Sequence, residues 1–347
     1  MKTQQTYYLW IIGCQYNEWD GARIKYALDH SGFNETDADN ADTIIILSCA
    51  VRQTAVNRIY GKLEAWKDKE VLIAGCVLKR DKKTLENKNA IIVDWDKAET
   101  IADILKIKDK QEFVKLLNQG NTASTYVPIM TGCNNFCAYC AVPYTRGREK
   151  SRPFADVVCE VKTIIHNCNA THHKGNKTEI MLLGQNVNSY KYDFVKLLKT
   201  LNNLDGDFII SFTSNHPKDM SREIIEAVSI LPKIKKEIHL PLQSGSNKIL
   251  KAMNRPYTID KYLKIVDMIN AIDPNIKITT DVIVGFPGET EQDFQKTVEV
   301  FERVKYHQAY INKYSPRAGT AAFALGDPIP WKEKQRRWHI LNKCLDR

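Results

Sequence analysis

The sequence of 347 residues lacks the features that mark a membrane or secreted protein. No apolar run approaches the roughly 20 residues that a helix needs to cross a bilayer. The opening segment leads directly into a strand-like stretch, Tyr7–Ile12, so we expect no signal peptide. The nine cysteines are odd in number and clustered, unlike those of a disulfide scaffold. We therefore expect a cytoplasmic protein, not associated with a membrane, whose cysteines bind metal.

Length and charge say less about the class of protein than the cysteines do. The chain is long enough for two domains, each with its own hydrophobic core. The sequence has 50 lysines and arginines against 41 aspartates and glutamates, a formal net charge of +9. This excess is compatible with a polyanionic partner, but many soluble proteins carry a similar one.

Three cysteines lie close together in the segment Thr131–Cys140. Cys133, Cys137 and Cys140 are spaced as C-x3-C-x2-C, with an aromatic residue before the last. Three thiolates on a short loop can hold three irons of a cubane cluster and leave the fourth iron open to another ligand. A zinc knuckle is the alternative, although no C-x2-C or H-x3-H pair follows at finger spacing. We predict an iron–sulfur cluster with one open iron.

Residues 1–118 alternate strand and helix patterns. The strand-like runs are Tyr7–Ile12, Thr43–Leu47, Val71–Ala74 and Ala90–Val93, and the helical stretches are Asp20–His30, Gln53–Lys67 and Ala98–Ile107. Repeated strand–helix–strand units predict a doubly wound α/β domain, with helices on both faces of a parallel sheet.

Three further cysteines each follow one of these strands. Cys14, Cys49 and Cys76 come after the first, second and third strand. The carboxyl ends of parallel strands carry the binding loops, so the three thiols are predicted to converge at one edge of the sheet. Ordinary buried cysteines are the alternative, because cysteine is common in protein cores.

A polar stretch over residues 118–124 predicts a linker, which places a second domain at residues 119–347. This domain shows six strand–helix units and ends in a basic helix around Glu333–Trp338. The expected strands are Tyr126–Met130, Glu179–Leu183, Phe208–Phe212, Glu237–Leu240, Lys277–Val284 and Gln308–Tyr314. Six units are fewer than the eight of a closed TIM barrel, so we predict a partial (β/α)6 TIM-like barrel.

The sequence around the cysteine loop resembles a known family. The C-x3-C-x2-C spacing is the signature of radical S-adenosylmethionine (SAM) enzymes. The flanking segments Gly132–Cys137 and Val142–Pro153 are similar to those of MiaB-type tRNA methylthiotransferases, and the similarity runs from about Gly13 to Ala322. The chain departs from the family pattern at Leu47 and Ser48, where Asn and Thr are usual, and at Tyr16, where Met often stands. No segment here resembles the C-terminal RNA-binding TRAM domain of such proteins.

The resemblance implies two 4Fe–4S clusters. One is held by Cys133, Cys137 and Cys140 and binds SAM, and the other is held by the cysteines that follow the first-domain strands, Cys14, Cys49 and Cys76. It also implies cleavage of SAM to a 5′-deoxyadenosyl radical, removal of hydrogen from C2 of an adenosine, and insertion of a methylated sulfur there. We name no side chain as a general base.

The expected substrate is N6-isopentenyladenosine at tRNA position 37, beside the anticodon. The base would be splayed out of a single-stranded loop. The alternatives within the family are a threonylcarbamoyl adenosine of tRNA and an aspartate of a ribosomal protein. Expected partners are the tRNA anticodon loop and an electron-donor protein such as flavodoxin or ferredoxin, and we expect a monomer. A non-modifying binding protein is the second class of function, but it would not need an open iron.

Two sets of candidate contacts complete the prediction. Polar loops follow the expected barrel strands, and by resemblance four of their residues and neighbours are candidates for holding SAM: Gln185, Gln243, Ser244 and Asp281. Turn chemistry and helix capping are the alternative explanation for such loops. Arg146, Arg148 and Arg152 are candidate RNA contacts, because arginine forks match phosphate oxygens. A solvated or interdomain arginine set is the alternative there.

Overall fold

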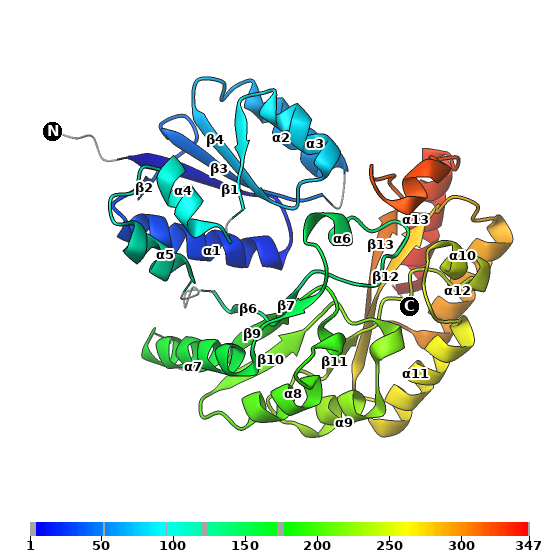
Figure 1. The fold of residues 1–347 in the computed structure, drawn as a ribbon. Helices are drawn as coiled ribbons and strands as arrows, with labels where there is room; N and C mark the ends of the chain where they lie inside the picture. The colour runs from blue at the N-terminus through cyan, green and yellow to red at the C-terminus, as the bar shows by residue number, and fades with distance from the viewer. Residues whose placement is uncertain (1–4, 51–52, 95, 119–123, 172–176, 346–347) are drawn as a thin grey trace. The chain divides into compact units, whose positions relative to one another are not determined.

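The computed structural model describes residues 5–50, 53–94, 96–118, 124–171 and 177–345 (Figure 1). The chain forms two compact units. The first comprises Met1–Tyr126 and the short segment Tyr144–Arg146, and the second comprises Val127–Pro143 and Gly147–Arg347. The predicted linker falls mainly on residues 119–123, which lie outside the described residues. The segment Tyr144–Arg146 was predicted in the second domain, and it packs with the first unit.

The first unit is built on a five-stranded sheet with the strand order β2-β1-β3-β4-β5. All four strand pairings are parallel. The strands are β1 (Thr6–Ile11), β2 (Asn34–Glu35), β3 (Thr43–Ser48), β4 (Glu70–Gly75) and β5 (Ala90–Ile92). Every residue of the central strand β3 is buried, as expected of a parallel strand covered on both faces. The short strand β2 was not predicted.

Helices cover both faces of this sheet, which confirms the predicted doubly wound fold (Figure 1). One core joins residues of α1, α4 and α5 to the sheet, and a separate core joins residues of α2 and α3 to it. The helices are α1 (Gln15–His30), α2 (Gln53–Leu63), α3 (Lys79–Glu86), α4 (Ala98–Ile104) and α5 (Lys110–Asn118). The sequence did not predict α3 or α5. Helix α3 has a low apolar content, with only Asp81 and Leu85 buried, so its periodicity is weak.

The second unit contains the six predicted strands in chain order, in two sheets of three. The pairs β9–β10, β11–β12 and β12–β13 are parallel. The orders are β10-β9-β6 and β11-β12-β13, and a bridge between Ile210 and Ile234 extends the first sheet toward the second. The strands are β6 (Tyr126–Pro128), β9 (Thr178–Leu183), β10 (Phe208–Phe212), β11 (Glu237–His239), β12 (Lys277–Val284) and β13 (Gln308–Lys313). A small antiparallel pair, β7 (Met130–Thr131) and β8 (Lys150–Ser151), flanks the cysteine loop.

Helices alternate with these strands and pack on one large hydrophobic core (Figure 1). They are α7 (Phe154–Thr171), α8 (Phe194–Asn202), α9 (Arg222–Ile230), α10 (Asn247–Ala252), α11 (Ile259–Ile272), α12 (Glu291–Val304) and α13 (Trp331–Leu345), with short 3-10 turns at Val187–Ser189, Pro217–Asp219 and Ala321–Leu325. A further short helix, α6 (Val142–Thr145), lies partly in the segment that belongs to the first unit. Side-chain caps begin α8, α9, α11 and α12. The alternation confirms the predicted partial barrel. Among the described helices, none is both long and apolar enough to span a bilayer.

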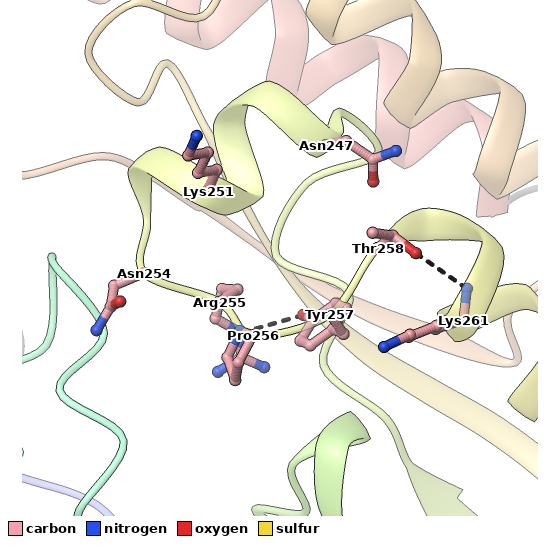
Figure 2. Close-up of a pocket in the computed structure, with 8 residues that line it drawn as sticks. All are labelled: Asn247, Lys251, Asn254, Arg255, Pro256, Tyr257, Thr258 and Lys261. Carbon is pink, nitrogen blue, oxygen red and sulfur yellow. Dashed lines mark hydrogen bonds between the residues drawn. The ribbon is translucent and has the colours of Figure 1, made fainter.

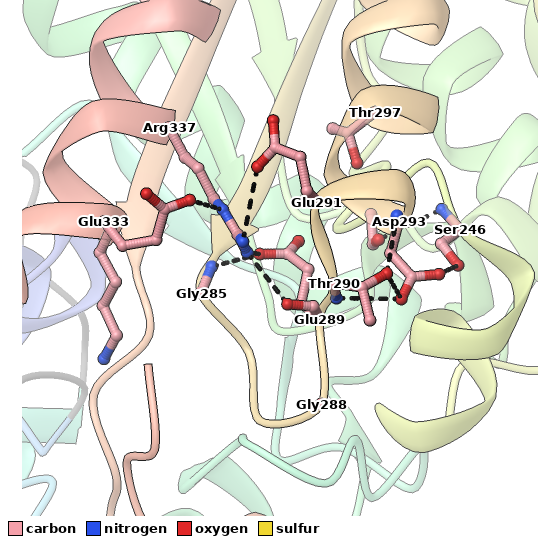
Figure 3. Close-up of polar contacts among 12 residues, drawn as sticks. Ser246, Gly285, Gly288, Glu289, Thr290, Glu291, Asp293, Thr297, Glu333 and Arg337 are labelled. Carbon is pink, nitrogen blue, oxygen red and sulfur yellow. Dashed lines mark hydrogen bonds and ion pairs between the residues drawn. The ribbon is translucent and has the colours of Figure 1, made fainter. Parts of the chain in front are cut away.

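A buried ion pair attaches the last helix to the loop that follows β12 (Figure 3). The Arg337 Nη1 of α13 lies 2.6 Å from Glu289 Oε2, with the two side chains only 5% and 1% exposed. The same carboxylate accepts the backbone N–H of Gly285 at 2.6 Å. Burial raises the pKa of Glu289, while the Gly285 N–H and the Arg337 charge act in the opposite direction. The pair therefore fixes the loop at the carboxyl end of β12.

We predict that Arg337→Met lowers the free energy of unfolding by about 3 kcal/mol, because it leaves Glu289 buried without its cation. Adding Glu289→Gln should recover most of that loss. The control is Arg336→Met on the exposed side of the same helix, where the arginine contacts Glu333 and Glu291. Arg336→Met should lower the free energy of unfolding by less than about 1 kcal/mol. Urea unfolding checks all three proteins, and equal costs for the two arginine variants would contradict the buried pair.

Candidate functional site

The cysteine loop of the second unit begins with a glycine that no other residue can replace without strain. Gly132 has φ of +75°, and a Cβ there would overlap the carbonyl group of Arg148. The Cys133 N–H donates to the Gly147 carbonyl at 3.2 Å, and the Cys140 N–H donates to the Cys137 carbonyl at 2.9 Å. These bonds fold the segment back on itself and hold the three cysteines on one compact loop.

The three thiols of this loop influence one another. Burial raises the pKa of Cys140 to about 12, and a charge on Cys137 adds to this effect. Burial also raises the pKa of Cys133. Two side chains donate to the sulfurs: Asn135 Nδ2 lies 3.4 Å from Cys133 Sγ, and Arg255 Nη1 lies 3.3 Å from Cys137 Sγ. Since metals bind the thiolate, cluster ligation would release protons from this loop.

In the first unit, Cys14, Cys49 and Cys76 follow the neighbouring strands β1, β3 and β4, as predicted. The Cys76 N–H donates to the Ser48 carbonyl at 2.9 Å, which aligns the ends of β3 and β4. Gly75 has φ of +84°, and a Cβ there would lie 2.7 Å from the Ser48 carbonyl oxygen. The strand order reverses between β1 and β3, and such switch points are where doubly wound sheets bind ligands.

Arg146 lies against this same edge of the first unit. Its Nε donates to Cys76 Sγ at 3.2 Å, and its Nη2 donates to Asn17 Oδ1 at 2.8 Å. The guanidinium also stacks 4.0 Å from the centre of the Tyr16 ring. Asn17 is itself buried and donates to the Ser48 carbonyl at 2.8 Å. Arg146 therefore supplies positive charge to a predicted cluster ligand.

Both cysteine sets fit an iron–sulfur cluster in their chemistry. Each offers three thiols and leaves one iron open, and each has an arginine donor on one sulfur. Among the described residues, no three Cys, His, Asp or Glu side chains are gathered closely enough to hold a metal ion. The cysteine side chains would therefore have to turn toward one another when a cluster binds.

Several buried polar atoms at the strand ends of the second unit have no partner among the described residues. They follow three successive strands, β9, β10 and β11, and are Gln185 Oε1, Asn186 Oδ1, Asn215 Oδ1, His216 Nε2 and Gln243 Oε1. An unpaired buried polar atom costs about 1–3 kcal/mol, so proteins rarely keep several together without a ligand. Their arrangement fits a bound polar molecule at the carboxyl ends of the strands.

The four residues predicted to hold SAM fall into two places. Gln243, Ser244 and Asp281 lie together, because the Gln243 N–H donates to the Asp281 carbonyl at 2.8 Å. Ser244 is fully buried, and its Oγ accepts the Ser246 N–H at 3.2 Å. Asp281 Oδ2 lies 3.0 Å from His239 Nε2. Gln185 lies apart from them in the sheet order, after β9.

His216 was within a predicted polar loop but was not singled out. Burial, reinforced by the charges of Arg255 and Lys218, lowers its pKa to about 2, so the ring is neutral at pH 7. Its Nδ1 accepts the Lys218 N–H at 3.2 Å. The proton of the neutral ring therefore lies on Nε2, which makes this buried atom a donor.

Arg148 and Arg152, the other predicted RNA contacts, differ in their surroundings. Arg152 Nη1 donates to the Pro128 carbonyl at 2.8 Å and pairs with Glu160 at 2.6 Å. Arg148 is exposed, with its guanidinium 4.3 Å from the centre of the Phe136 ring. Arg146 and Arg152 would have to leave these internal contacts to reach a phosphate, whereas Arg148 is already at the surface.

No pattern in the sequence pointed to Arg255. It stands alone between two helices, outside any spacing pattern, yet its side chain is buried against the cysteine loop. The polar run Thr213–Pro217 was the available signal for Asn215 and His216. That signal does not distinguish a ligand contact from a helix cap, because the same residue types serve both.

Two family descriptions match the chain. Residues 127–301 match the radical SAM superfamily, and residues 6–95 match an uncharacterized protein family designated UPF0004. Apart from Tyr144–Arg146, the radical SAM match falls in the second unit, and the other match falls in the first unit. Together they account for most of the chain.

Curated relatives cover nearly the whole chain. The tRNA-2-methylthio-N(6)-dimethylallyladenosine synthase of Alkaliphilus oremlandii is 38% identical over 96% of this chain and 76% of its own length. The protein of the same name from Syntrophomonas wolfei is 39% identical over 99% of this chain and 82% of its own.

Solved structures of distant sequence share the fold. The radical SAM methyltransferase TsrM of Kitasatospora setae superposes with a TM-score of 0.66 at 12% identity, over 92% of this chain and 77% of its own. The radical SAM enzyme OxsB superposes with a TM-score of 0.60 at 10% identity, over 98% of this chain and 56% of its own. At such identities the likeness concerns the fold alone.

We predict that His216 makes the fold sensitive to acid. The pKa of an unfolded histidine is about 6.5, whereas the folded value is about 2. Below pH 6.5 the His216 ring is therefore protonated in the unfolded chain but stays neutral in the folded chain, so the free energy of unfolding falls as the pH falls. As the pH falls from 6 to 4, the free energy of unfolding of His216→Asn should therefore decrease less than that of the parent. The difference should be up to about 1.4 kcal/mol for each pH unit. Urea unfolding over this range checks it, and a constant difference between the two proteins would contradict it.

Proposed function

Because the chain belongs to the MiaB-type tRNA methylthiotransferases of the radical SAM superfamily, we propose that it is a tRNA-2-methylthio-N6-dimethylallyladenosine synthase. It transfers a methylthio group to C2 of N6-isopentenyladenosine at tRNA position 37. The names of the curated relatives favour this substrate over threonylcarbamoyl adenosine or a ribosomal-protein aspartate.

The observation that carries the proposal is the presence of two cysteine sets at separate sites. Cys14, Cys49 and Cys76 follow three neighbouring parallel strands, in addition to the C-x3-C-x2-C loop of the second unit. Cleavage of SAM needs one cluster, so a second set of three thiols has no purpose in that step. When bound, one 4Fe–4S cluster supplies the electron that cleaves SAM and the other supplies the sulfur that is transferred.

The residues of the second unit hold SAM and position it. The unpaired side-chain amide oxygens of Gln185 and Gln243 accept hydrogen bonds from SAM, and the Nε2–H of the neutral His216 donates one to it. Ser244, which follows β11, and Asp281, which lies within β12, complete the predicted contacts. Placement of the Gln185, His216 and Gln243 groups after the carboxyl ends of barrel strands follows the general rule for such folds.

The tRNA contacts are proposed from charge and exposure. Arg148 is exposed beside the aromatic ring of Phe136, so it can bind a phosphate while the ring offers a stacking surface. Arg146 and Arg152 remain predicted RNA contacts, and they would have to exchange their internal partners for phosphate. We further propose a monomer that acts in the cytoplasm and receives electrons from a flavodoxin- or ferredoxin-type protein.

The proposed function predicts a specific iron content. After anaerobic reconstitution, the parent should hold about eight irons, and a Cys14→Ala/Cys49→Ala/Cys76→Ala variant about four, because each cubane contributes four. The matched control replaces the three cysteines outside both sets, Cys159, Cys168 and Cys344, and should keep about eight. Iron and sulfide analysis measures this.

Either of two results would oppose the proposal. About four irons in both the parent and the first variant would leave the first unit without a cluster, and methylthiolation would be the wrong reaction. Loss of iron in the control variant would show that the additional cysteines take part.

The SAM contacts predict opposite changes in stability and binding. Gln185→Met removes an oxygen that has no partner among the described residues, so the free energy of unfolding should stay equal or rise slightly. The same change should weaken SAM binding about tenfold, because a hydrogen bond contributes about 1 kcal/mol or more. Urea unfolding and equilibrium dialysis of SAM measure the two effects. If SAM binding is unchanged, Gln185 is not a contact.

A further inference from the structure

A pocket of about 440 Å³ opens between α10 and α11 on the second unit (Figure 2). Lys251 of α10 and Lys261 of α11 line it, and both are exposed. The remaining lining side chains are neutral except for Arg255, so no acidic residue of the described chain lines this pocket. Figure 2 shows the Lys261 side chain extending toward Tyr257. The pocket therefore presents a positive surface.

One side chain of the inner wall of this pocket reaches a cysteine sulfur of the loop. Arg255 lines the pocket, is 8% exposed, and donates from Nη1 to Cys137 Sγ at 3.3 Å. Its Nε donates to the Tyr257 hydroxyl at 3.1 Å, which fixes the guanidinium in place (Figure 2). One buried residue therefore separates the pocket from a predicted cluster ligand.

A neighbouring residue of the pocket is attached to the same loop. Asn254 Nδ2 donates to the Phe136 carbonyl at 2.9 Å, and the Ala138 N–H donates to the Met253 carbonyl at 2.9 Å. A molecule seated in the pocket would thus contact residues that are hydrogen-bonded directly to the cysteine loop.

The pocket lies on the helix side of the strands, away from the predicted SAM contact Asp281. Successive residues of a strand point to opposite faces. Asp281 bonds to His239 on one face of β12. Its neighbour Thr280 points to the other face and shares the Leu240 carbonyl with Tyr262 of α11. Substrate RNA has to reach the side where SAM is held, whereas a reductant needs only to approach the cluster.

We propose that this pocket is the docking site of an acidic one-electron carrier protein of the flavoprotein or iron–sulfur class. The inference rests on the proposed function, which requires such a donor. One electron leaves the reduced carrier, which is oxidised by one equivalent, and enters the cluster held by Cys133, Cys137 and Cys140, which is reduced by one. No atom is transferred. The lysines attract the carrier, and Arg255 connects the pocket to Cys137 through one hydrogen bond.

The test reverses the charge of the pocket and compares two reductants. In a Lys251→Glu/Lys261→Glu variant, cluster reduction by reduced flavodoxin should slow about tenfold or more at low salt, because opposite charges steer association. Reduction by dithionite, a small chemical donor, should be unchanged. The matched control is Lys162→Glu/Lys199→Glu, which makes the same charge change at exposed sites on α7 and α8. Stopped-flow absorbance and electron paramagnetic resonance of the reduced cluster measure the rate.

The inference is supported if only the pocket variant slows with flavodoxin and the difference disappears at high salt. It is overturned if both double variants slow equally, or if neither does. Loss of tRNA affinity in the pocket variant, with the flavodoxin rate intact, would overturn it and assign the surface to RNA. Failure of the parent to cleave SAM with dithionite would contradict the proposed function, while the rate of cluster reduction would still decide the docking site.

Discussion

The carboxyl ends of neighbouring parallel strands lie at the same edge of a sheet, and both units depend on this constraint. In the first unit it brings the backbone after Ile11, Ser48 and Gly75 to one edge, although these positions are far apart in sequence. In the second unit it sets the loops after β9, β10 and β11 side by side in chain order. Residues with metal-binding or polar side chains occupy these positions in both units. The first-unit cysteine set and the polar strand ends of the second unit therefore follow from strand order, whereas the loop with Cys133, Cys137 and Cys140 is a local motif.

Buried polar groups are of two kinds: those that have a partner in the protein, and those that have none among the described residues and can bind a ligand. Arg337 and Glu289 are almost fully buried and satisfy each other, so they fix a loop and need no further partner. Arg146 and Arg255 each place a positive charge on a cysteine sulfur, where it would stabilise a thiolate ligand. Gln185, Gln243 and His216 carry buried polar atoms without partners among the described residues. Because such atoms are costly, they support the proposed SAM contacts more directly than the presence of polar loops does.

Much of the fold was predictable from the sequence because strands with continuous apolar runs are unmistakable, as in Thr43–Ser48. The first-unit cysteine set was predictable for the same reason, since strand ends locate Cys14, Cys49 and Cys76, and the second set was predictable from its C-x3-C-x2-C spacing. The environment of single arginines was not predictable from the sequence. Arg146 and Arg148 are two residues apart in the sequence, yet one lies on Cys76 and the other is exposed. Arg255 has no pattern around it, and only tertiary packing brings it to Cys137. Periodicity reports which face of an element is apolar, and it carries no information on a lone charged side chain.

The central claim is that the two cysteine sets have different tasks, SAM cleavage and sulfur supply. The most direct test is an anaerobic reaction of SAM with tRNA that carries N6-isopentenyladenosine, followed by mass analysis of nucleosides. The parent should form both 5′-deoxyadenosine and the methylthio nucleoside. The variant lacking Cys14, Cys49 and Cys76 should still form 5′-deoxyadenosine and no methylthio nucleoside. Formation of the methylthio nucleoside by that variant would contradict the account.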